Sequence, residues 1–360
     1  MYNKLYYRQI FKITFLLIFV LCLSTSLLAQ DKEKDNTNGQ VRKVGYVDVE
    51  TKIEEAKILT SANSQRCIIE GRKIYRQLLE DESFKPGSLE EGLLYEGFGY
   101  ATYKLRDEMT NPVILELYNK ALSIYSKLPN KVGKLHQARV LCRIGAFFNW
   151  NGNQYSVKQQ RQGLNCLLKS LKIVKALSGE EAKKVEMDVL TKLGEHYYYS
   201  LKWNFVLALK YDEQALKLYQ EAGDIKQFEI MVKIGFDKFH MGKNKKTLLK
   251  YFEQALEISR QWGDKKAQVI TSDGLGIFYN KLIFYKQGDV NDNLEKGEQY
   301  YKEALDICKS INDEFLEADI MENFSNLYNS ADDIEKEKRY SELSRKLRAK
   351  LNKECTILVK

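Results

Sequence analysis

The chain has 360 residues and a formal net charge of +8, with its basic and acidic residues interspersed along its length. Three basic residues lie within the first thirty positions, and without them the charge is +5, which is too mild to indicate nucleic-acid binding. Six cysteines are scattered without short pairing distances, so a disulfide framework is not expected.

Residues 1–29 have the order of segments found in a secretory signal peptide. A basic start is followed by the apolar run 13–23 and by small residues that end at Ala29. We expect cleavage after Ala29 and a periplasmic or secreted location. The apolar stretch 11–29 is also near the minimum length of a membrane span. An uncleaved membrane anchor is therefore the alternative interpretation.

The segments that follow differ in composition. Residues 30–47 are polar and charged and indicate a disordered tether. Residues 48–87 predict two helices that form an N-terminal cap or a degenerate repeat, because the end of a repeat array must cover its apolar face. Residues 88–352 carry repeated phrases, and residues 353–360 are interpreted as a short tail.

One phrase of seventeen residues occurs three times. Ala208–Asp224 reads ALKYDEQALKLYQEAGD, and Leu248–Asp264 reads LLKYFEQALEISRQWGD forty positions later. Gly297–Asp313, GEQYYKEALDICKSIND, keeps the Tyr, the Ala-Leu pair and the final Asp. The recurring Ala and Tyr are three and four residues apart, so they share one face of a helix. The Gly-Asp ending suits a left-handed turn and the cap of the next helix.

A second phrase precedes each copy: an apolar residue, a small residue, and an aromatic residue a few positions later. Its small residues stand at positions 97, 145, 194, 235, 276 and 325. The two phrases together predict six helical hairpins with small residues where their helices touch. The expected units are 88–128, 134–177, 182–222, 225–262, 265–310 and 313–352.

These phrases resemble the tetratricopeptide repeat (TPR), whose first helix carries Leu-Gly-x-x-Tyr and whose second carries Ala-x-x-x-aromatic-x-x-Ala. The resemblance covers about residues 90–352. Steps of 41 to 49 residues between the small positions exceed the usual unit of about 34. They resemble the subclass with extended helices, of about 40 residues per unit. The resemblance implies an all-α fold, a right-handed α-α superhelix (solenoid) of stacked helical hairpins.

In that family the first helices line a concave groove, in which peptides usually bind. Helical phase selects the residues two before and four or five after each small residue. They combine basic, aromatic and amide side chains that suit an extended peptide with a carboxylate. The alternative is that they form a solvated helix face. The candidate groove residues are Arg143, Asn149, Trp150, Lys192, Tyr198, Tyr199, Lys233, His240, Asn280 and Lys281. The family's own clamp pattern is not reproduced.

The sequence offers no arrangement of catalytic or metal-ligating residues. His136, His196 and His240 fall in three different units, without the spacing of a helical zinc site. Gly274 and Gly276 lie inside a predicted helix, where packing explains them better than a nucleotide loop. We therefore expect no catalytic residue, no cofactor and no metal.

Two functions remain open at this stage, and an enzyme is the weakest third. The first is a non-enzymatic scaffold, exported from the cytoplasm, that binds a protein or a peptide with an acidic or carboxylate-bearing segment. The second is a membrane-anchored sensor or adaptor that binds a peptide or small ligand and signals to a separate membrane partner. Nucleic acid is not an expected partner, and a membrane is expected only through an uncleaved leader.

Overall fold

The structure is a computed structural model that describes residues 47–61, 65–82, 84–105, 111–150, 155–199 and 203–359. The predicted leader, and the predicted tether up to residue 46, lie outside the described residues. The part of the chain that is described belongs to one compact unit, Tyr46–Lys360.

The described residues form fourteen helices and no strand. In chain order the helices are α2 (Val47–Ser61), α3 (Gln65–Glu80), α4 (Leu89–Lys104), α5 (Asn111–Lys127), α6 (Lys131–Trp150), α7 (Val157–Lys175), α8 (Glu180–Tyr199), α9 (Phe205–Ala222), α10 (Gln227–His240), α11 (Lys245–Gln261), α12 (Lys265–Phe284), α13 (Val290–Ser310), α14 (Glu314–Ser330) and α15 (Ile334–Val359).

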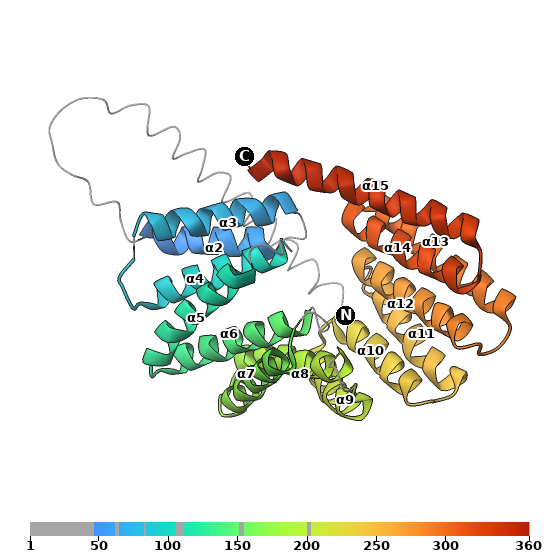
Figure 1. The fold of residues 1–360 in the computed structure, drawn as a ribbon. Coiled ribbons are helices and arrows are strands. Elements are labelled where there is room, and N and C mark those ends of the chain that lie inside the picture. The colour runs from blue at the N-terminus through green and yellow to red at the C-terminus, as the bar shows by residue number, and fades with distance from the viewer. Residues whose placement is uncertain are drawn as a thin grey trace. The chain divides into compact units, whose positions relative to one another are not determined.

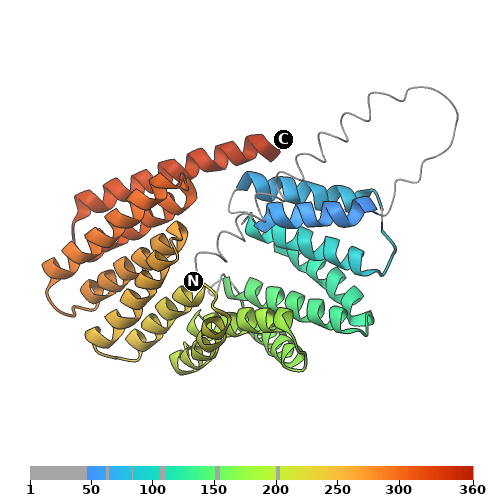
Figure 2. The ribbon, with the colours of Figure 1, turned by 180° about the vertical axis from the view of Figure 1, so that it is seen from behind.

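The helices pair into antiparallel hairpins that follow one another in chain order (Figures 1 and 2). Even-numbered helices are the first helices of the hairpins, and odd-numbered helices are the second. Each first helix packs on its own second helix, and consecutive hairpins pack on each other. The expected all-α solenoid of stacked hairpins is therefore confirmed.

Small residues of the first helices permit close approach of the second helices, as the repeated phrases predict. A methyl group added at Gly235 would lie 2.8 Å from Cε2 of Phe252, and one at Gly276 would lie 2.5 Å from Cζ of Tyr301. Phe252 and Tyr301 are fully buried. Each glycine therefore leaves the space that an aromatic ring of the same hairpin fills.

The Gly-Asp endings act as turns and caps. Gly223 ends α9 in the left-handed conformation, with φ 60°. Asp264 begins α12, and its Oδ1 accepts a hydrogen bond from the backbone N–H of Ala267 at 3.0 Å. Such a cap satisfies one of the free N–H groups at a helix start.

Consecutive first helices pack on each other along most of the array, but α8 and α10 approach each other least closely. At that junction, as at the others, the second helix of one hairpin, α9, packs on the first helix of the next, α10. Side chains, not backbone contact, therefore connect α8 to α10.

Six hairpins, from α4–α5 to α14–α15, overlap the expected units 88–128 to 313–352, and α6 begins at Lys131, three residues before its expected unit. The last helix differs from expectation at its end. Helix α15 continues to Val359, into residues 353–360 that the sequence analysis assigned to a tail. That segment contains no Pro or Gly to end the helix.

Candidate functional site

The candidate groove residues lie on the first helices α6, α8, α10 and α12, where helical phase placed them. The side chain of Trp150 lies outside what the structure describes. The other nine have defined surroundings, and most of them contact the chain itself. Their role as ligand contacts stays a prediction.

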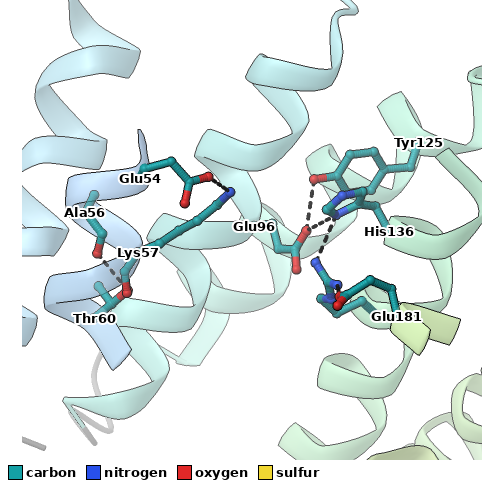
Figure 3. Close-up of polar contacts among 9 residues, drawn as sticks. Glu54, Ala56, Lys57, Thr60, Glu96, Tyr125, His136 and Glu181 are labelled. Atoms are coloured by element: carbon teal, nitrogen blue, oxygen red, sulfur yellow. Dashed lines mark hydrogen bonds and ion pairs between the residues drawn. The ribbon is translucent and has the colours of Figure 1, made fainter. Parts of the chain in front are cut away.

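Arg143 is engaged by a buried carboxylate on the preceding first helix. Its guanidinium forms an ion pair with Glu96 at 3.4 Å and lies 4.2 Å from the centre of the Tyr100 ring. Tyr125 donates a hydrogen bond to Glu96 at 2.9 Å, and His136 Nδ1 lies 3.1 Å from the same oxygen (Figure 3). Burial alone would raise the pKa of Glu96, but Arg143 and the His136 hydrogen bond lower it to about 2. Arg143 therefore neutralises an internal charge.

Lys192 and Lys233 share a second internal carboxylate. Lys192 Nζ lies 2.7 Å from Oε2 of Glu195, one turn further along α8, and Lys233 of α10 binds the other oxygen, Oε1. Burial opposes ionisation of Glu195, yet the two ammonium groups lower its pKa to about 2. The same contacts raise the pKa of Lys233, against the effect of burial. The ion pair of Lys233 with Glu195 bridges α10 and α8, two first helices with little direct backbone contact.

Asn149 and Tyr198 also bind neighbouring repeats. Asn149 Nδ2 donates to the backbone carbonyl of Lys192 at 2.9 Å, and its Oδ1 lies 2.7 Å from Nδ1 of His196. Tyr198 Oη lies 3.0 Å from Nε2 of His240. These amide and ring contacts hold successive first helices together and leave little free hydrogen-bonding capacity.

His240 is in addition stacked on a ring of the preceding hairpin. Its ring lies 4.5 Å from that of Phe205, at an interplanar angle of 10°. Burial, together with the charge of Lys281, lowers the pKa of His240 to about 4. His240 is therefore neutral at physiological pH.

Asn280 and Lys281 differ from the other candidates. Asn280 Oδ1 is buried without a hydrogen-bond partner in the described chain. Lys281 Nζ lies 5.9 Å from the centre of the Phe236 ring, and burial lowers the pKa of its ammonium group. No carboxylate of the described residues pairs with Lys281. Of the predicted residues, this pair on α12 has the most capacity for an outside ligand.

A pair of buried acids lies between α9 and α10, and the sequence analysis missed it. The carboxyl groups of Asp212 and Asp237 face each other, and both residues are fully buried. In the described part of the chain, no donor reaches Asp212 Oδ1 or either oxygen of Asp237. Burial raises the pKa of both groups, mutual repulsion raises it further for Asp237, and Lys233 opposes the change. The pair therefore retains a proton near neutrality.

The repeated phrase contains a signal for this pair. Asp212 occupies the position at which the other two copies have Phe252 and Tyr301, and it packs against Gly194 as those rings pack against their own glycines. A charged residue at an aromatic core position is the departure that a repeat alignment reveals.

A pocket of about 260 Å³ lies among α12, α14 and α15 and was also missed. Its polar lining consists of Asp273, Asp319, Glu322, Asn323 and Arg348. Asn323 Nδ2 donates to Asp273 at 2.9 Å, and Arg348 pairs with Asp319 at 2.8 Å. Burial raises the pKa of Asp273 to about 7, although the Asn323 hydrogen bond opposes the change.

The position of Asn323 could have indicated this pocket. It lies two residues before the small residue Ser325, the same phase that selected Arg143, Lys192 and Lys233. The residues predicted at this phase are basic and lie in the second to fourth units, so Asn323, an amide in the sixth unit, was not among them. Asp273 comes from α12 and Arg348 from α15, and helical phase within one unit does not reveal these contributions from other helices.

Among the described side chains, no group of three or more His, Cys, Asp or Glu is arranged to hold a metal ion. None of the helices that the structure describes is long and apolar enough to cross a membrane.

Comparison with known proteins shows structural similarity without close sequence similarity. No protein-family model matches the chain, and no curated protein matches it. The apo form of RapI is similar with a TM-score of 0.62 and 15% identity, over 85% of this chain and 99% of that one.

Two further similar structures contain a bound molecule. The Rap conjugation gene regulator of plasmid pLS20, in complex with the Phr* peptide, has a TM-score of 0.57 and 14% identity, over 89% of this chain and 81% of that one. A Rap protein complexed with competence and sporulation factor has a TM-score of 0.50 and 13% identity, over 92% of this chain and 93% of that one. At this identity the similarity establishes the fold, which is of the TPR type.

Proposed function

We propose that this chain is a non-enzymatic scaffold that binds a peptide, or an extended segment of a protein, on its first helices. The TPR-type fold and the similarity to a Rap regulator solved with a peptide support this function. The fold alone serves many partners, so the argument for a particular ligand must come from the side chains.

The observation that carries the proposal is the pocket among α12, α14 and α15. Three carboxyl groups surround one guanidinium there, so the pocket has an excess of acidic groups. A protonated amine or guanidinium of a peptide would replace water and pair with the carboxylates that Arg348 does not neutralise. We infer that the ligand carries a cationic side chain or a free N-terminus.

The ion pairs of the central repeats limit where an acidic segment of the ligand can bind. Arg143, Lys192 and Lys233 already neutralise Glu96 and Glu195, so a ligand carboxylate would have to displace an internal partner. A second set of polar groups remains available on α12. We propose that Lys281 and Asn280 receive a carboxylate or a backbone amide of the same peptide.

The test uses the full chain and short synthetic peptides that carry either arginine or its neutral analogue citrulline. We expect the arginine peptides to bind about tenfold more tightly, since a charge-assisted hydrogen bond contributes ~1.5 kcal/mol. Glu322→Gln should remove this preference, whereas Glu257→Gln, an exposed change on α11, should leave it intact. Equal affinity for both peptides would contradict the cationic site. A panel without any binding peptide would contradict the scaffold itself.

The pH dependence provides an independent measurement. The pKa of Asp273 is raised to about 7, so its carboxyl group becomes charged as the pH rises through neutrality. Affinity for the arginine peptide should therefore increase between about pH 6 and about pH 8. Asp273→Asn should abolish the increase. A flat profile for the unmodified chain would exclude Asp273 as a ligand contact.

We infer that the chain is exported, because residues 1–29 combine a basic start, an apolar run and a small-residue end. N-terminal sequencing of the mature protein tests this inference. A mature chain that begins at Gln30 would support export. Retention of Met1 would instead favour the membrane-anchored sensor or adaptor.

A further inference from the structure

Exposed aromatic side chains, with one methionine between them, gather at the loops that join first helices to second helices in three consecutive hairpins. Trp203 is 71% exposed and Tyr199 is 58% exposed, at the loop between α8 and α9. Phe284 and Tyr285, at the loop between α12 and α13, are 67% and 50% exposed. Met241 lies at the loop after α10, between them in chain order, and is also exposed. Equivalent loops of stacked repeats lie on one edge of the array.

A continuous series of ring contacts supports these exposed side chains. Trp203 lies 6.4 Å from Phe205, which stacks on His240. Next to His240, Phe239 contacts Tyr285 at 5.7 Å. Phe205 of α9 and Phe239 and His240 of α10 form the inner part of this series. The exposed rings of Trp203 and Tyr285 pack against them. We call this surface the aromatic edge.

The charges along the aromatic edge are predominantly positive. Lys243, Lys246 and Lys286 lie in or beside its loops, and no acidic partner for them is found among the described residues. The nearest acid in these loops, Asp289, caps the start of α13. Lysines without partners beside exposed Trp and Tyr rings are the side chains found where a protein meets the surface of a bilayer.

The opposite edge of the same hairpins has a different character. The loops from second helices to first helices carry Asp224, Asp264 and Asp313, of which Asp264 and Asp313 cap the helices that follow. Trp262 stands alone there, 44% exposed. Lys226 and Lys265 lie beside these acids, so the two edges differ chiefly in their exposed rings, which are concentrated on the aromatic edge.

We propose that the aromatic edge is a docking surface for an anionic phospholipid bilayer. The exposed rings enter the headgroup region, and the three lysines pair with lipid phosphates. This contact is peripheral and uses the folded array, so it is separate from the leader and from the peptide pocket. A membrane was expected only through an uncleaved leader.

The experiment measures the environment of single tryptophans in the full chain. Trp150→Phe with Trp262→Phe leaves Trp203 as the only indole, and Trp150→Phe with Trp203→Phe leaves Trp262. Each protein is mixed with vesicles of phosphatidylcholine and phosphatidylglycerol, with and without brominated acyl chains. We expect Trp203 emission to shift to shorter wavelength and to be quenched by bromine, while Trp262 emission remains unchanged.

The leader is present in both proteins, so it cannot produce a difference between the two tryptophans. Neutral vesicles of phosphatidylcholine should give a much weaker response. Lys243→Gln, Lys246→Gln and Lys286→Gln together should weaken the Trp203 response roughly a hundredfold, at about fivefold per lysine. Trp203 emission that stays unshifted and unquenched on anionic vesicles would overturn the proposal, and a protein partner would then better explain the aromatic edge. Equal quenching of Trp203 and Trp262 would also overturn it.

Discussion

The buried acids Asp212 and Asp237 make a prediction about stability against pH. The folded pair retains a proton that the unfolded chain, whose Asp side chains have an ordinary pKa of 3.8, has already lost. Folding is therefore favoured at low pH, and this contribution is lost as the pH rises from about 4 through the raised pKa values near neutrality. One extra proton bound to the folded state over about three pH units changes the free energy of unfolding by about 4 kcal/mol.

Asp237→Asn keeps the shape of the side chain and removes its ionisation. The amide can donate to Asp212, so we expect the variant to be more stable than the parent above neutral pH, by ~2–4 kcal/mol. At about pH 5 the two should be nearly equal. Urea unfolding across this pH range measures the difference, with Glu253→Gln, an exposed change on α11, as the matched control. Parallel stability curves for parent and Asp237→Asn would refute the reasoning.

Two further substitutions test how the hairpins are held together. Gly276→Ala places a methyl group against the buried ring of Tyr301 and should cost ~1–3 kcal/mol in urea unfolding, whereas an increase in stability would show that the ring can move aside. Arg143→Met leaves Glu96 buried without its guanidinium partner and should lower stability by ~3 kcal/mol at neutral pH. That loss should shrink on acidification, as Glu96 becomes able to take up a proton, and an undiminished loss would argue against the ion pair as its cause.

The close approach of paired helices was predictable from local spacing. An aromatic residue on one helix and a glycine on the other recur in register, and Phe252 facing Gly235 is the physical result. The extension of α15 to Val359 was harder to predict from the sequence, because the end of a helix depends on the balance between propensity and tertiary contacts rather than on one residue.

The internal partners of the candidate site residues could not be predicted from the sequence. Phase along a helix correctly put Arg143, Lys192 and Lys233 on first helices, but it carries no information about what stands opposite. Glu96 precedes Arg143 by 47 residues, and Glu195 precedes Lys233 by 38. Only stacking of the repeats reveals that these cations have internal partners.

By itself, the sequence determined that this protein is a row of helical hairpins, because a helix face and a turn depend on residues only a few positions apart. The tertiary structure decided which polar groups neutralise one another, which acids are buried as a pair, and which acids line a pocket. Those properties depend on distances between residues that are remote in the chain, and such distances are set by how each hairpin packs on the next.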